Sequence, residues 1–133
     1  METNLQWNVY NGRCPTRMVL DRIADKWTVL IIGRLADGTK RFSELRKAID
    51  GISQKMLTET LRGLERDGIV SRRLYASVPP RVEYSLTELG QSLVGMVSSV
   101  RTWAETHIEQ VLEARATYDA GQARSAASPA TGG

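Results

Sequence analysis

The sequence GISQKMLTETLRGLER, residues 51–66, predicts a helix with one buried face and one exposed face. Ser53 suits the N-cap position, because its hydroxyl can accept a hydrogen bond from the first turn of a helix. Leu57, Leu61 and Leu64 follow at spacings of four and then three residues, which places them along one side. We therefore expect the leucines to enter the core and the opposite side of the helix to face solvent.

A shorter helix is expected immediately before this one. Ser43 is a plausible N-cap for a helix over 44–49, and the Asp50-Gly51 pair then favours a tight turn. Residues 39–42 are long enough only for a short strand or an extended lead-in. Two helices joined by so short a turn are typical of a helix-turn-helix.

The segment after the helix predicts a β-hairpin. Apolar and polar residues alternate over 69–75 and again over 81–86, the two-residue period of a strand. Residues 76–80 are too many for a two-residue turn and include two stiff prolines, so the hairpin has a protruding tip. The expected fold is mainly α with a small β-hairpin wing (α+β), a winged helix-turn-helix.

Further helices are expected on both sides of this motif. One begins near Pro15, and a second over 27–35 is apolar around most of its circumference and should lie in the core. A long helix over 88–115 carries an apolar seam, and glycines within its first turns predict a bend or split there. The seam consists of Leu89, Leu93, Met96, Val100, Trp103 and His107. It packs either within the monomer or against a second copy of the chain.

Length and composition indicate one domain with two flanking segments. The chain has 133 residues and a mass of 14.8 kDa, close to the commonest size of a single domain. We expect an N-terminal arm over 1–13, a winged-helix domain with a C-terminal dimerisation helix over 14–115, and a disordered tail over 116–133. The tail is expected because Ala, Gly and Ser leave little to bury there.

The middle of the chain is basic. Residues 34–81 hold eleven Lys and Arg against six Asp and Glu, a net charge of +5, which suggests a polyanion such as double-stranded DNA. Gln, Lys, Thr and Arg on the outer helix face suit base edges and phosphates, and arginines flank the wing. The candidate DNA contacts are Ser53, Gln54, Lys55, Thr58, Arg62, Arg72, Arg73 and Arg81. For each of them an ordinary solvated surface residue is the alternative.

Several segments resemble the HxlR family of winged-helix transcriptional regulators. They are RFSELR at 41–46, GISQKMLT at 51–58, VPPRVEYSLT at 78–87, and the pairs Cys14-Pro15 and Lys26-Trp27. The likeness runs from about Cys14 to His107. It implies a homodimer joined through N- and C-terminal helices that binds a near-palindromic operator, with repression the favoured outcome, and it implies no enzymatic activity.

Cys14 is the candidate sensor of a signal. It lies between Arg13 and Arg17 at the start of a helix, where positive charge and the helix N-terminus favour the reactive thiolate. Resemblance to family members that sense oxidants or electrophiles through a cysteine here implies the same role. The alternatives are a structural thiol, and a small aromatic or hydrophobic effector bound at the dimer interface. Trp7, Trp27 and Trp103 are candidates to line such a site or to serve as packing anchors.

Composition also excludes several classes of function. One cysteine rules out an intrachain disulfide, and one histidine, His107, rules out a histidine-based triad or a multi-histidine metal site in one chain. We therefore expect no enzyme, no metal and no cofactor. No run of about 20 apolar residues is present, and no secretory signal, so no membrane partner and a cytoplasmic location are expected. A winged helix that binds protein instead of DNA is a further alternative.

Overall fold

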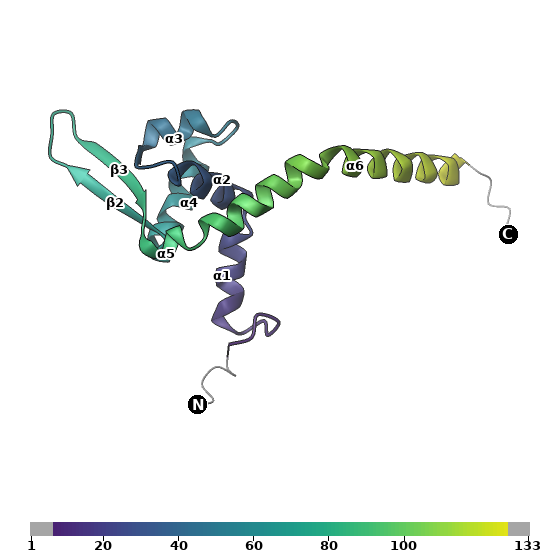
Figure 1. The fold of residues 1–133 in the computed structure, drawn as a ribbon, viewed down its shortest axis with the longest axis horizontal. Helices are drawn as coiled ribbons and strands as arrows, with labels where there is room; N and C mark the ends of the chain where they lie inside the picture. Colours follow the sequence, from purple (N-terminus) through teal and green to yellow (C-terminus); the bar gives the residue numbers. More distant parts are fainter. Residues whose placement is uncertain (1–6, 128–133) are drawn as a thin grey trace. The chain divides into compact units, whose positions relative to one another are not determined.

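A computed structural model describes residues 7–127 of the chain. The elements follow the order α1 (Pro15–Ile23), α2 (Lys26–Leu35), β1 (Lys40–Arg41), α3 (Phe42–Ala48), α4 (Gln54–Arg66), β2 (Val70–Tyr75), β3 (Arg81–Leu86), α5 (Glu88–Gln91) and α6 (Val94–Ala127) (Figure 1). The chain divides into two compact units at Ser98 and Ser99 within α6, so the first unit holds every element before α6. This architecture is a winged helix-turn-helix, as the sequence predicts.

The core of the first unit forms between α2 and α4. Ile31, Ile32 and Leu35 of α2 are buried, as the apolar circumference of that helix predicts. The leucines of α4 at 57, 61 and 64 are at most 1% exposed, which confirms the buried face of the 54–66 helix. Burying each of these side chains contributes about 1.5–3 kcal/mol. The core therefore fixes which face of α4 points outward.

Helix caps account for where α2 and α4 begin. Asp25 accepts a hydrogen bond from the amide of Thr28, and the Ser53 hydroxyl accepts one from the amide of Met56 at 3.1 Å. Each bond satisfies an amide that has no partner inside its helix. Gly51, in the turn between α3 and α4, has a φ of 86°, a conformation that side chains disfavour. The Asp50-Gly51 pair thus forms the turn between α3 and α4, as the sequence predicts.

The α3 helix differs from the expectation at its start. It begins at Phe42 with Arg41 as N-cap, so the prediction of Ser43 as the N-cap of a helix over 44–49 is wrong. The amide of Arg41 donates to the Glu44 carboxylate at 2.7 Å. Because β1 leads directly into the helix, the Glu44 side chain reaches back to the Arg41 amide. The helix is therefore capped at Arg41 rather than at Ser43.

The three strands form one antiparallel sheet in the order β1-β3-β2. The central strand β3 pairs with β2 along its whole length, from Val70 opposite Leu86 to Tyr75 opposite Arg81. The β2–β3 hairpin forms the wing (Figure 1). The short β1 places Arg41 opposite Glu83 on the other edge, so residues 40–41 are a strand rather than only a lead-in.

The C-terminal region departs from the expected boundaries. The expected long helix is split, with α5 ending at Gln91 and α6 beginning at Val94, as glycines near its start predict. The predicted disordered tail over 116–133 is wrong for residues 116–127, which are helical. Alanine, arginine and glutamine favour a helix that is already nucleated, so α6 extends through them. Residues 128–133 of that tail, and 1–6 of the arm, lie outside the described residues.

Two helices leave their apolar side chains uncovered. No residue of α1 is buried, and Met18, Val19 and Leu20 are exposed. In the second unit, none of the described residues of α6 from Ser99 onward is buried. The large apolar side chains exposed in that unit are Val100, Trp103, Ile108, Leu112 and Tyr118. A single helix cannot bury such side chains against itself.

Candidate nucleic-acid interface

The outer side of α4 carries the first group of candidate DNA contacts. Gln54, Lys55 and Arg62 are exposed and Thr58 is half-buried, on the side of the helix away from the buried leucines. Ser53 is exposed as well, although its oxygen is engaged in capping the helix. The helix therefore presents polar and cationic groups together with the amides of its first turn. Such a surface matches a major groove lined by phosphates.

The wing arginines do not share one face. Arg72 and Arg73 are neighbours along β2, so their side chains leave opposite sides of the sheet. The cross-strand partner of Arg72 is Tyr84, and that of Arg73 is Glu83. The three predicted wing contacts therefore separate into Arg72 on one side and Arg73 with Arg81 on the other.

Arg72 lies beside α4. A cavity of about 320 Å³ lies between α4 and the sheet and brings Arg62 and Arg72 together. Its full lining is Thr58, Leu61, Arg62, Glu65, Arg72 and Tyr84. Two arginines and two hydroxyl groups around one cavity give it a positive, hydrogen-bonding character. The single carboxylate of Glu65 offsets part of that charge.

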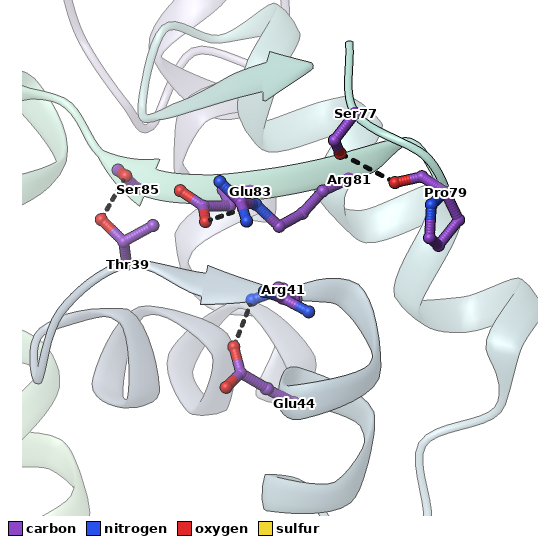
Figure 2. Close-up of polar contacts among 8 residues, drawn as sticks. All are labelled: Thr39, Arg41, Glu44, Ser77, Pro79, Arg81, Glu83 and Ser85. Atoms are coloured by element: carbon purple, nitrogen blue, oxygen red, sulfur yellow. Dashed lines mark hydrogen bonds and ion pairs between the residues drawn. The ribbon is translucent and has the colours of Figure 1, made fainter. Parts of the chain in front are cut away.

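Arg73 and Arg81 meet around an aromatic ring on the other side of the wing. Their guanidinium carbons lie 5.0 and 4.4 Å from the centroid of Tyr75. Arg81 also forms an ion pair with Glu83 on its own strand, with Nε 3.1 Å from the carboxylate (Figure 2). A second hollow of about 540 Å³ lies between the wing tip and the start of α3, with Arg41 and Arg81 in its lining. Arg81 is thus held in place and half-buried rather than free in solvent.

Four of these groups were not among the sequence-derived candidates. The strand register places Tyr75 opposite Arg81, Glu83 opposite Arg73, Tyr84 opposite Arg72, and Arg41 opposite Glu83. The two-residue alternation of β2 and β3 contained part of that information, because residues two apart share a face. The pairing of β1 with β3, which introduces Arg41, has no comparable signal in a two-residue strand.

Cys14 lies elsewhere in the fold, as the N-cap residue of α1. Its side chain is buried, with its sulfur 3.0 Å from the Thr16 hydroxyl and 3.2 Å from the Asn8 amide, both of which donate to it. The Thr16 hydroxyl is the largest cause of a lowered pKa of the Cys14 thiol, followed by the Asn8 amide.

Arg17 is expected to favour the Cys14 thiolate through its charge, but its side chain bonds to backbone carbonyls instead. Its guanidinium donates to the backbone carbonyls of Val9, at 2.9 Å, and Tyr10. It thereby ties the segment before α1 to that helix. The direction of the expected effect on Cys14 holds, but hydrogen bonds close to the sulfur are its leading cause.

The tryptophans and His107 occupy separate settings. Trp27 packs against the core, whereas Trp7 and Trp103 are more than half exposed. Within α6, the His107 ring stacks on Trp103 with centroids 4.6 Å apart. Across residues 7–127, no helix combines the length and the apolar composition needed to cross a membrane.

Several known proteins similar to this chain in sequence and fold are described as transcriptional regulators. The chain is 44% identical over 108 residues to the uncharacterised HTH-type transcriptional regulator YtfH of Escherichia coli strain K12, an alignment that covers 81% of this chain and 86% of YtfH. The structure of the transcriptional regulator ytfH from Salmonella typhimurium matches with a TM-score of 0.78 and 45% identity, over 82% of this chain and 97% of that one.

A redox regulator is also among the similar structures. HypR in its oxidised form matches with a TM-score of 0.65 and 47% identity, over 70% of this chain and 96% of HypR. The sequence profile of the HxlR-like helix-turn-helix family matches residues 22–112, which include every element from α2 to α5 and much of α6. This chain is therefore a member of the HxlR-like helix-turn-helix family of transcriptional regulators.

Proposed function

We propose that the chain is a sequence-specific repressor that acts as a homodimer on a near-palindromic operator and is released when Cys14 is oxidised or alkylated. The observation that carries this proposal is the division of α4 into two sides. Its leucines are at most 1% exposed, whereas Gln54, Lys55 and Arg62 are exposed to solvent. Since the core already uses the other side, this face is available to enter a major groove.

The wing extends the same interface. Arg72 joins Arg62 around the cavity beside α4, so a phosphate there would meet both guanidinium groups. Arg73 and Arg81 lie on the opposite side of the wing, near its tip. Recognition by helix and wing together spans more of a duplex than the helix alone, and no step in this function requires enzymatic chemistry.

Dimerisation is supported by the apolar side chains of α1 and α6. Each helix exposes large apolar residues, among them Met18, which is 68% exposed, and Trp103, which is 58% exposed. Two copies of one small domain would read two half-sites about 34 Å apart, on successive major-groove faces. A twofold protein on a near-palindromic operator satisfies this geometry.

Control through Cys14 is supported by its surroundings and by a similar protein. Hydrogen bonds from Thr16 and Asn8 lower the pKa of the thiol, which favours the thiolate that reacts with oxidants and electrophiles. HypR is described as a redox regulator. A covalent change at Cys14 would alter the N-cap of α1, one of the helices proposed to join the two subunits.

The test uses a duplex that the wild-type protein enriches from a random DNA library. Binding should weaken steeply between about 50 and 200 mM salt, with a slope set by the number of phosphates neutralised. Arg62→Ala should weaken binding and reduce the slope by about one phosphate contact, whereas Arg124→Ala, a matched change near the end of α6, should do neither. Binding that does not depend on salt, or equal slopes for both variants, would refute this interface.

The sensor is tested on the same duplex. Diamide or methylglyoxal should release wild-type protein and leave Cys14→Ser bound. Equal release of both proteins would refute the sensor role and leave Cys14 as a structural thiol.

A further inference from the structure

Arg22, near the end of α1, bonds to the far end of the recognition helix. Its Nε donates to the Asp67 carboxylate at 3.0 Å, and Asp67 is the residue that caps the C-terminus of α4. The two residues are 45 positions apart in the sequence. A cation at this end also suits the negative end of the helix dipole. The bond therefore joins α1 to α4 at the end of α4 opposite its Ser53 cap.

The guanidinium of Arg22 also lies directly on Gly63. A Cβ atom added to Gly63 would overlap all three terminal atoms of that guanidinium. Glycine in the middle of a helix costs about 1 kcal/mol relative to alanine, so α4 carries an unfavourable residue at this position. The close approach of Arg22 supplies a physical reason for it, since only glycine leaves room for the group.

This contact joins α1 to α4 outside the apolar core. No residue of α1 is buried, so the apolar core does not fix that helix as it fixes α2. Arg22 itself is one of the half-buried residues of α1, and its side chain is 33% exposed. An ion pair this exposed contributes little to stability, and its consequence is geometric.

We propose that Arg22, seated on Gly63 and bonded to Asp67, is a positioning residue that sets the orientation of the recognition helix relative to α1. The proposal rests on the DNA-binding function proposed above. In a homodimer joined partly through α1, this orientation determines how the two copies of α4 face the two half-sites. Arg22 thus governs operator affinity without touching DNA.

The experiment compares three variants on the duplex that the wild-type protein selects and on a scrambled duplex of equal length. Arg22→Ala removes the guanidinium, Gly63→Ala displaces it, and the double variant does both. Gly95→Ala is the matched control, because it makes the same change in α6 at a site with open space around it. Thermal unfolding is measured on each protein alongside binding.

Both single variants should lower the ratio of selected to scrambled affinity by about fivefold. Gly63→Ala should do so without a fall in the unfolding temperature, because alanine improves the helix while the ion pair is lost. Adding Gly63→Ala to Arg22→Ala should cost nothing further, since the group it displaces is already absent. Gly95→Ala should bind as wild type does.

Two results would overturn the positioning role while wild-type binding stands. One is unchanged selectivity in both single variants, and the other is a Gly63→Ala penalty that persists in full when Arg22 is absent. A wild-type protein that enriches no duplex would instead refute the proposed function itself and this inference with it.

Discussion

The guanidinium of Arg81 lies 4.4 Å from the centre of the Tyr75 ring, directly across the wing. Arg73 approaches the same ring at 5.0 Å, so one aromatic side chain orders two cations near the wing tip. Cation–π contacts are worth about 0.5–1 kcal/mol at exposed sites and about 2 kcal/mol when desolvated. Arg73 is exposed, whereas Tyr75 and Arg81 are half-buried. A phosphate that binds such a pair meets side chains whose positions are already restricted, which lowers the entropic cost of binding.

Replacing Tyr75 with leucine should therefore weaken DNA binding about threefold without changing its salt slope. The slope should stay because every cationic group is still present. Fluorescence anisotropy over a salt series measures both quantities. Tyr10→Leu, at a tyrosine that is 89% exposed, is the control and should bind normally. A reduced slope in Tyr75→Leu would mean that an arginine contact has been lost rather than loosened.

Leu61→Ala should destabilise the fold by about 2–5 kcal/mol, because Leu61 is 1% exposed and belongs to the apolar core. Chemical denaturation followed by circular dichroism measures this loss. Leu74→Ala, at a wing position that is 60% exposed, should change the free energy of unfolding far less. Similar losses at both sites would contradict the assignment of the leucine face to the core.

Thr16→Val should raise the pKa of Cys14, because it removes the hydrogen bond that lowers this pKa most. A lowered pKa means that the thiolate stabilises the folded state above the pKa of the unfolded thiol. That stabilisation is lost as the pH falls through the folded pKa. Thiolate ultraviolet absorbance against pH reports on Cys14 alone, since it is the chain's one cysteine.

The Thr16→Val titration should therefore move to higher pH, and the thiolate contribution to stability should begin at higher pH. Thr16→Ser keeps a hydroxyl and should titrate as wild type does. If valine and serine variants gave the same curve, the Thr16 hydroxyl would not be the group that tunes Cys14.

Trp103→Glu should convert a dimer of twice the 14.8 kDa chain mass into monomers, because it places a charge among the exposed apolar residues of α6. Sedimentation at micromolar concentration measures the mass. Thr102→Glu introduces the same charge one residue away, on a different side of the helix, and should leave the dimer intact. Wild-type protein that sediments as a single chain would rule out the proposed homodimer at that concentration.

Much of the first unit follows from local sequence pattern. The 54–66 helix, its Ser53 cap, its buried leucines and the 81–86 strand all match the structure. Each depends on the spacing of apolar residues or on a capping side chain, and these act within a few residues. The two wrong predictions, at the start of α3 and in the tail, fall at element boundaries. There, a neighbouring strand or an already nucleated helix outweighs the preference of a single residue.

By itself, the sequence determined which faces are apolar, where the helices turn and that the middle of the chain is cationic. Only the tertiary structure decided which arginines act together, pairing Arg62 with Arg72 and Arg73 with Arg81, and seating Arg22 on Gly63. The physical reason is the distance along the sequence over which each kind of interaction acts. Periodicity and capping are local, whereas strand register and the packing of α4 on the sheet join residues far apart in the chain and exist only once the core has formed.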